Sequence, residues 1–313
     1  MFNVVWNIIL FIGSVAALIW AASLAVKHLT QLARKFGLSE FFTAFILMAF
    51  ATSIPEVFVG ISSAIDQAPQ IALGDTIGSN VIDLTLIVGL IALLGRGLST
   101  DGAAVRKDLW ILVAASLFPL FLGLDGSISR ADGLLLLVFF AIYQGWQIKQ
   151  GGRFQRSLEG AQLKTSRSLG WLALAAMVLI ISSKLLIDAS SHLALNIGLP
   201  EIFIGMTVVA LGTSIPELAF GIRALKLGHS HMVLGDLLGA SITNITLALG
   251  LTAVISGIPT ANSSLFLLLS IAYPVMLTAF ILTIRSRAKI TISIALGLIL
   301  MYVVFLFMEG MIK

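Results

Sequence analysis

The chain contains no cysteine and few charged residues, and both scarcities limit what it can be. Without cysteine there is no disulfide, no thiolate metal ligand and no cysteine nucleophile. Charged residues make up 11% of the 313 residues, against 58% hydrophobic residues, and the mean hydropathy is +1.06. A soluble domain of this length needs more charge to cover its surface, so the composition predicts an integral membrane protein.

Histidine is also scarce, and its placement argues against an enzyme. All four histidines fall at the expected ends of apolar segments, at His28, His192, His229 and His231. A nucleophilic serine would therefore lack its base, and we expect no enzymatic activity and no cofactor. The net charge of +4 is spread over short clusters between apolar runs. This pattern predicts no nucleic-acid partner, and no obligatory protein partner is evident.

Apolar runs long enough to cross a bilayer recur along the whole chain. A membrane helix needs about 20 apolar residues. Cutting the chain at charge clusters and at glycine or proline gives ten segments. They cover 4–26, 38–65, 70–95, 107–124, 132–148, 169–191, 199–226, 231–257, 263–284 and 289–308. The first run lacks the basic start of a signal peptide, so we expect it to be retained as a helix.

The basic residues predict the orientation of these segments. With the N-terminus outside, the inner loops hold 16 of the 19 Lys and Arg residues, leaving Arg130, Lys184 and Lys313 outside. Positive residues resist translocation. We therefore expect a multi-pass protein of the cell (plasma) membrane with both termini outside. The basic stretch 149–168 is expected to be a cytoplasmic linker.

The chain contains an internal repeat. Residues 37–92 align with 198–253 at a constant offset of 161, and 21 of the 56 pairs are identical. Each half holds five segments, an odd number, so the copies must enter the membrane from opposite sides. The predicted fold is all-α, with ten transmembrane helices arranged as two inverted five-helix repeats, 1–148 and 169–313. Inverted repeats are typical of secondary transporters, whose binding sites lie where the halves meet.

Three acidic residues fall in the middle of apolar segments: Glu56, Glu217 and Asp83. A charge at the bilayer centre costs roughly 3 kcal/mol on insertion scales, so such residues are usually functional. No basic residue lies equally deep; Lys184, the nearest, falls towards an outer end. Unpaired buried carboxylates indicate bound cations or protons.

The neighbours of the two glutamates suit hard cations. Ala49, Thr52, Ser53 and Glu56 form one helical stripe, which Ala210, Thr213, Ser214 and Glu217 repeat. Pro55 and Pro216 bend their helices and free carbonyl oxygens just before each glutamate. Carboxylates, carbonyls and hydroxyls are the ligands that calcium takes in sets of six to eight. The lack of thiols and of nearby histidine argues against zinc, copper or nickel.

A second stripe places acids and small residues four apart. It runs Asp75, Ser79, Asp83 in the first half and Asp236, Ala240, Asn244 in the second. For the glycines around it we expect close helix packing. For Asp75 and Asp236, near predicted helix starts, we expect helix capping, with ion entry as the second choice.

The paired sequences ATSIPEVFVG and GTSIPELAFG, followed by GDTIGSNVID and GDLLGASITN, resemble the two alpha-repeats of the cation/calcium antiporter superfamily. Within it the chain is similar to prokaryotic sodium/calcium exchangers. The resemblance implies Glu56 and Glu217 as central calcium ligands, completed by the carbonyls of Thr52 and Thr213. It also implies Asp83 and Asn244 as a middle polar pair, and flanking sodium sites lined by Ser53, Ser214, Ser79 and the carbonyls of Ala49 and Ala210.

Two departures from the family pattern bear on the coupling ion. The middle pair usually has Asn in the first repeat and Asp in the second, whereas Asp83 and Asn244 are swapped here. Ala240 also stands where the second repeat usually offers a serine hydroxyl, which weakens one predicted sodium site.

The leading hypothesis is therefore calcium/sodium antiport by alternating access. Calcium/proton antiport is the alternative, since desolvated carboxylates can be protonated. A passive cation channel or sensor is the minor one, because the sequence lacks a carbonyl-ring filter. The expected partners are inorganic cations and the lipid bilayer.

Overall fold

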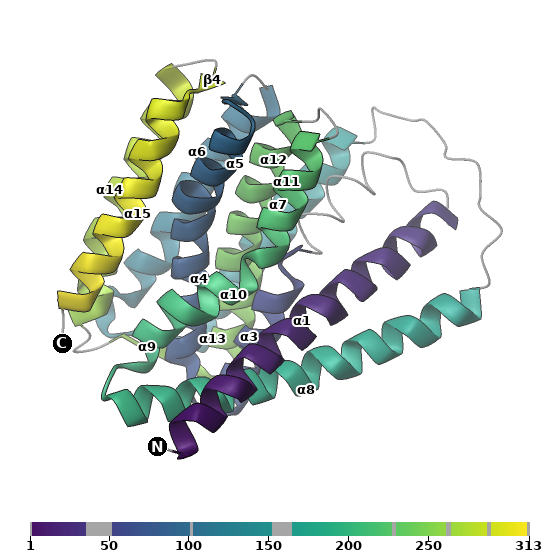
Figure 1. The fold of residues 1–313 in the computed structure, drawn as a ribbon, viewed down its shortest axis with the longest axis vertical. Helices are drawn as coiled ribbons and strands as arrows, with labels where there is room; N and C mark the ends of the chain where they lie inside the picture. The colour runs from purple at the N-terminus through teal and green to yellow at the C-terminus, as the bar shows by residue number, and fades with distance from the viewer. Residues whose placement is uncertain are drawn as a thin grey trace.

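The computed structural model describes residues 2–35, 52–100, 103–151, 165–226, 230–260, 264–286 and 289–311. Their secondary structure is helical apart from four two-residue strands (Figure 1). The first half contains α1 (Phe2–Lys35), α3 (Ile54–Ile65), α4 (Pro69–Val81), η2 (Ile82–Ile87), α5 (Val88–Leu94), β1 (Leu98–Ser99), α6 (Ala103–Leu122), η3 (Gly123–Asp125), β2 (Ser127–Ile128) and α7 (Arg130–Gly151). The second contains α8 (Thr165–Ile197), α9 (Glu201–Ile204), η4 (Gly205–Val209), α10 (Ala210–Thr213), α11 (Ile215–Lys226), α12 (Ser230–Thr243), η5 (Asn244–Ala248), α13 (Leu249–Ser256), β3 (Ile258–Pro259), α14 (Ser264–Ser286), β4 (Lys289–Ile290) and α15 (Ile292–Met311).

Nine of the ten predicted segments coincide with a helix or with a series of joined helices, and the described part of segment 38–65 contains α3. Within the described ranges, six helical stretches are long and apolar enough to cross a membrane: Val4–Ala25, Pro69–Leu94, Ser168–Asn196, Glu201–Lys226, Val233–Ser256 and Ile292–Gly310. Of the predicted segment 38–65, the structure describes only the part from Thr52 onwards, so Ala49 lies outside the described residues. Most of the predicted linker 149–168 lies outside them too.

The helices that carry the repeated motifs are interrupted at equivalent places. Ser53 has φ −78° and ψ 1° before α3, and Ser214 has φ −79° and ψ 1° between α10 and α11. These breaks directly precede Ile-Pro, as expected for a residue without an N–H. The π-helical turns η2 and η5 place Asp83 and Asn244 at matching positions. Such turns often mark functional sites in helices.

Two short antiparallel ladders tie the halves together. β1 pairs with β4 and β2 pairs with β3, so each ladder joins a loop of one half to a loop of the other. Paired loops must lie at the same end of the molecule. In the ten-segment division, β1 and β4 are six segments apart and β2 and β3 are four apart. Even separations return the chain to the same end, as the pairing requires.

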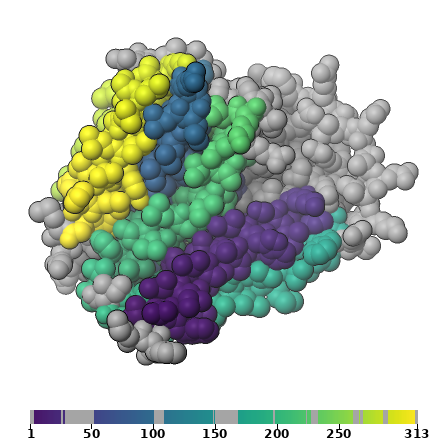
Figure 2. All heavy atoms as spheres, in the orientation of Figure 1, coloured from purple at the N-terminus to yellow at the C-terminus, as the bar shows by residue number. Residues whose placement is uncertain are grey.

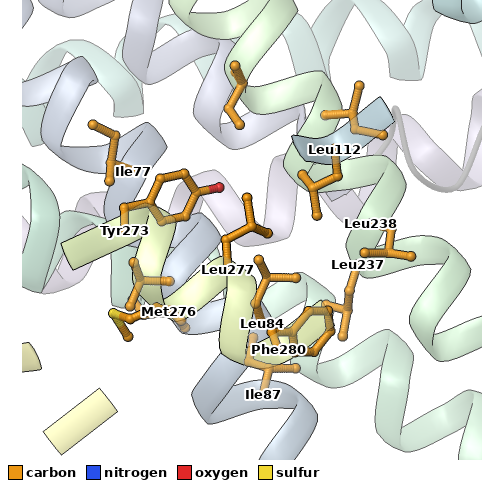
Figure 3. Close-up of a cluster of buried hydrophobic side chains, with 14 of the residues drawn as sticks. Ile77, Leu84, Ile87, Leu112, Leu237, Leu238, Tyr273, Met276, Leu277 and Phe280 are labelled. Atoms are coloured by element: carbon orange, nitrogen blue, oxygen red, sulfur yellow. The ribbon is translucent and has the colours of Figure 1, made fainter. Parts of the chain in front are cut away.

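Buried apolar side chains form two clusters. The larger one lies among α4, α5, α6, α12, α13, α14 and α15. Figure 3 shows part of it, where Leu277 and Phe280 of α14 meet Leu84 and Ile87 of η2. The smaller cluster joins α1 to α8 and to α3. α1 and α8 run side by side in opposite directions along one face of the molecule (Figures 1 and 2).

Glycines allow the backbones of the two halves to approach closely. A Cβ at Gly74 would lie 2.2 Å from the carbonyl oxygen of Ile202, and one at Gly78 would lie 2.3 Å from that of Met206. α4 therefore packs directly on α9 and η4 of the other half. The predicted packing role of these two glycines is confirmed.

This contact gives the first testable prediction. Gly78→Ala would force a methyl group onto the Met206 backbone, which cannot yield as a side chain can, and overpacking of this kind costs about 1–3 kcal/mol. We expect a lower unfolding temperature in detergent. The matched control is Gly297→Ala in α15, where an added Cβ meets no atom within 4 Å and alanine favours helix. Equal unfolding temperatures for the two variants would contradict the packing role.

Candidate cation-binding site

Glu56 and Glu217 occupy matching positions in the first turns of α3 and α11. The helix break before each one places the carboxylate at a helix N-terminus, where the macrodipole favours negative charge. The two side chains are 1% and 0% exposed, and none of their four carboxylate oxygens has a hydrogen-bond partner among the described residues. The two glutamates interact electrostatically with each other, so the fold brings them into one region.

Asp83 and Asn244 lie beside the glutamates, in η2 and η5. Asp83 is completely buried and interacts electrostatically with both Glu56 and Glu217. Asn244 is also completely buried, and η5 packs against α3, which carries Glu56. Neither the Asp83 carboxylate nor the Asn244 amide has a hydrogen-bond partner. We call these four residues, Glu56, Glu217, Asp83 and Asn244, the central cluster.

Several hydroxyl-bearing side chains of the two motifs lie near the central cluster or beside its helix breaks. Thr213 lies near Glu56 and Ser214 lies near Asp83, in both cases beyond hydrogen-bonding geometry. Ser53 donates a long hydrogen bond of 3.5 Å to the carbonyl of Ala240. The carbonyl of Ala210 already accepts the Ser214 N–H at 3.1 Å and the Thr213 hydroxyl at 3.3 Å. Thr52 is buried directly before the helix break.

The predicted capping role of Asp75 and Asp236 is wrong. α4 begins at Pro69 with Ala68 as its N-cap, and α12 begins at Ser230, so both aspartates lie in helix interiors. Asp75 Oδ1 accepts the Thr213 hydroxyl at 2.9 Å and the Ser79 hydroxyl at 3.5 Å. The helices begin within one residue of the predicted starts at 70 and 231, but each aspartate lies six residues after its helix start, too far along to cap it.

Each aspartate instead belongs to the electrostatic surroundings of the central cluster. Asp75 interacts with Glu56 and Asp83. Asp236 interacts with Asp83 and Glu217. Neither aspartate is among the predicted site residues. The signal for them was their spacing in the second stripe, where Asp75 precedes Asp83 by eight residues and Asp236 precedes Asn244 by eight.

No basic side chain among the described residues neutralises these acids. The ion pair seen there joins Lys184 to Asp66 at 3.4 Å, at the C-terminal end of α3. Across the same ranges, no three acidic or histidine side chains converge into a metal centre of their own. A cation bound here would therefore need carbonyl and hydroxyl oxygens in addition to carboxylates, which suits hard cations.

Two further buried polar features were not anticipated. Asn80 donates to the Ser241 carbonyl at 3.4 Å and to the Tyr273 hydroxyl at 3.3 Å. Asn80 and Ser241 are equivalent positions of the repeat, so the halves meet there. Glu309 in α15 is fully buried without a hydrogen-bond partner, and its electrostatic neighbour is Tyr302.

Comparison with known proteins identifies the family. The family model described as "Sodium/calcium exchanger protein" matches residues 6–149 and 167–310, two ranges related by the offset of the sequence repeat. The inner membrane protein YrbG of Escherichia coli K12 is 30% identical over 261 residues, covering 80% of this chain and 78% of its own. The sodium/calcium exchanger MaX1 of Methanosarcina acetivorans is 27% identical over 324 residues, covering 88% and 91%.

Solved structures give the same answer. The sodium-calcium exchanger NCX_Mj superposes with a TM-score of 0.66 at 26% identity, over 96% of this chain and 97% of its own. The H+/Ca2+ exchanger CAX has a TM-score of 0.77 at 17% identity over 96% and 82%, which shows the fold alone. MaX1 and NCX_Mj are sodium/calcium exchangers, so these relatives are membrane transporters and not enzymes. The chain is a multi-pass membrane protein and belongs to the sodium/calcium exchanger family.

Proposed function

We propose that the protein exchanges calcium for sodium across the membrane, with calcium held between Glu56 and Glu217. One observation carries this proposal: two glutamates from equivalent helix breaks are buried together without hydrogen bonds or a basic partner among the described residues. An uncompensated buried charge costs several kcal/mol. A divalent cation between the carboxylates would remove that cost, which no contact from the described residues does.

The ligand set proposed for calcium uses neutral oxygens as well. The carbonyls of Thr52 and Thr213 would complete the shell around the two carboxylates. Ser53, Ser214 and Ser79, with the carbonyls of Ala49 and Ala210, would line sodium sites beside it, and Asp83 and Asn244 would lie between them. Calcium accepts six to eight such oxygens in irregular geometry. Calcium and sodium would therefore compete for the same glutamates, which is the basis of exchange.

Alternating access would come from two inverted halves, 1–148 and 169–313, joined by the linker 149–168. Support comes from the sequence repeat, from the ladders that pair loops of opposite halves, and from the opposite directions of α1 and α8. Two similar halves can exchange conformations, which gives inward-open and outward-open states of similar energy.

Calcium/proton exchange is the second candidate, and Ala240 is the observation that favours it. The first half offers the Ser79 hydroxyl, hydrogen-bonded to Thr213 at 3.2 Å, where the second half offers only a methyl group. One sodium site would therefore lack a ligand. Protons need no such ligand, because a buried carboxylate can take up the proton itself.

The glutamates provide the decisive test of the proposed site. Glu56→Gln and Glu217→Gln each keep the side-chain shape but remove one charged ligand, which is worth roughly 3 kcal/mol when buried. We expect calcium affinity to fall about 100-fold and calcium flux in proteoliposomes to be lost. Glu201→Gln, the same change in the first turn of α9, serves as control and should retain both. Unchanged calcium binding in the two site variants would refute the site.

The coupling ion is tested by imposing one gradient at a time. In proteoliposomes loaded with sodium at equal pH on both sides, calcium uptake should follow the sodium gradient and stop when that gradient is collapsed. Uptake driven by a pH gradient alone, in the absence of sodium, would instead support the proton-coupled candidate. Uptake that trans calcium fails to accelerate would argue for a channel.

The proposed orientation, with both termini outside the plasma membrane, can be tested by single-cysteine labelling because the chain has no cysteine of its own. Ser127 of β2 and Lys289 of β4 are both exposed and belong to different ladders. In intact cells, we expect a membrane-impermeant maleimide to label Ser127→Cys. Lys289→Cys should be labelled only after permeabilisation. The reverse pattern would invert the topology, and labelling of both in intact cells would contradict the division into ten spans.

A further inference from the structure

The acid on each side of the central cluster has a different environment. The first flank comprises Asp75, Ser79 and Thr213, and the second flank comprises their repeat equivalents Asp236, Ala240 and Thr52. In the first flank, Asp75 Oδ1 accepts hydroxyls from Thr213 and Ser79, and those hydroxyls lie 3.2 Å apart. The carboxylate, Ser79 and Thr213 thus satisfy one another within the protein.

In the second flank this network is missing. Asp236 is only 6% exposed, yet no residue that the structure describes hydrogen-bonds to either of its carboxylate oxygens. Ala240, one helical turn further along α12, has no hydroxyl to donate. The Ala240 carbonyl accepts the Ser53 hydroxyl at 3.5 Å, so that hydroxyl is directed away from Asp236. A buried carboxylate without donors is destabilising, because no hydrogen bond offsets the free energy lost when it leaves water.

The surroundings of Asp236 indicate which kind of partner its carboxylate can bind. Asp236 interacts electrostatically with Asp83 and Glu217, so it borders the central cluster on the side of the second glutamate. Its neighbours are acids, and the ion pair of the described residues lies elsewhere, at Lys184 and Asp66. A cation is the group that a carboxylate in these surroundings can bind without a hydrogen-bond donor.

We propose that Asp236 is a direct ligand of a monovalent hard cation, sodium, in the second flank, where its carboxylate replaces the hydroxyl that Ala240 lacks. This inference rests on the proposed cation exchange and adds an ion position outside the glutamate pair, where sodium would compete with calcium through the charges of Glu217 and Asp83, with which Asp236 interacts. The two flanks, equivalent in sequence position, then differ in chemistry. The second flank binds sodium through a charged oxygen, and the first flank offers neutral hydroxyls around a carboxylate that is already hydrogen-bonded.

Equilibrium binding of radioactive calcium to the purified protein, with sodium as competitor, tests the proposal. In the Asp236→Asn variant, the sodium concentration that displaces half of the calcium should rise about tenfold or more. Calcium affinity in the absence of sodium should change by less than about threefold, since calcium lies between the glutamates. The matched control is Asp188→Asn, the same change at an exposed position of α8 outside the central cluster and its flanks, and its sodium response should change by less than about threefold.

A rescue variant separates a ligand from a structural residue. Adding a hydroxyl in Asp236→Asn/Ala240→Ser should restore part of the sodium response, at least about threefold, because the serine oxygen offers a neutral ligand at the same turn. A purely structural role for Asp236 would give no such recovery. If Asp236→Asn does not fold, Asp236→Ser is smaller and also uncharged, and the same loss is expected.

The outcomes distinguish this inference from the proposed function. Equal sodium responses of Asp236→Asn and Asp188→Asn would overturn the role of Asp236 while leaving calcium binding at the glutamates intact. Failure of the wild-type protein to bind calcium would instead overturn the proposed function. A selective loss of sodium competition in Asp236→Asn, with rescue by Ala240→Ser, supports the inference.

Discussion

The structure depends on buried negative charge that the described protein groups do not neutralise. Glu56, Glu217, Asp83 and Asp236 are nearly or fully excluded from solvent, and all their carboxylate oxygens lack hydrogen-bond partners. In a medium of low dielectric constant, such charges repel one another and lose their hydration. A protein that only needed a stable core would replace them with apolar residues. Their presence at the meeting point of two halves is therefore the strongest argument for ion binding.

The backbone around this charge is adapted to expose oxygen atoms. A continuous α-helix uses its carbonyls for internal hydrogen bonds, whereas the breaks at Ser53 and Ser214 and the π turns η2 and η5 disturb that pattern. Irregular backbone of this kind is tolerated at membrane depth only inside protein or beside water. Close packing through Gly74 and Gly78 keeps the halves in contact there. Closely packed helices therefore lie around the helix breaks and π turns that carry the central cluster.

The two halves are equivalent in plan but not in chemistry. Ser79 and Thr213 hydrogen-bond to Asp75, whereas Ala240 leaves Asp236 without a donor. An inverted repeat needs matching backbones to alternate between two states, but it does not need matching ligands. Different ligands in the two flanks allow ions to bind with different strengths on the two sides of the central cluster. The proposed role of Asp236 follows from this asymmetry.

Much of the site could be read from the sequence because its determinants are local. The scarcity of charge indicated the membrane, the offset of 161 revealed the repeat, and Ile-Pro-Glu located both helix breaks and both glutamates. Proline removes an N–H wherever it stands, and a carboxylate within an apolar run is costly in any fold. The ten segments likewise follow from local features, namely the length of the apolar runs and the charge clusters, glycines and prolines that divide them.

The tertiary structure decided what depends on partners distant in the chain. Whether Asp75 caps a helix or accepts a hydroxyl depends on Thr213, which is 138 residues away, and no local pattern contains that contact. Asp236 also depends on the opposite half for a hydrogen-bond donor, and no described residue there donates to its carboxylate. The sequence determined which polar side chains would be buried. Only the folded interior decides which of them find a hydrogen-bond partner, because those partners come from distant parts of the chain.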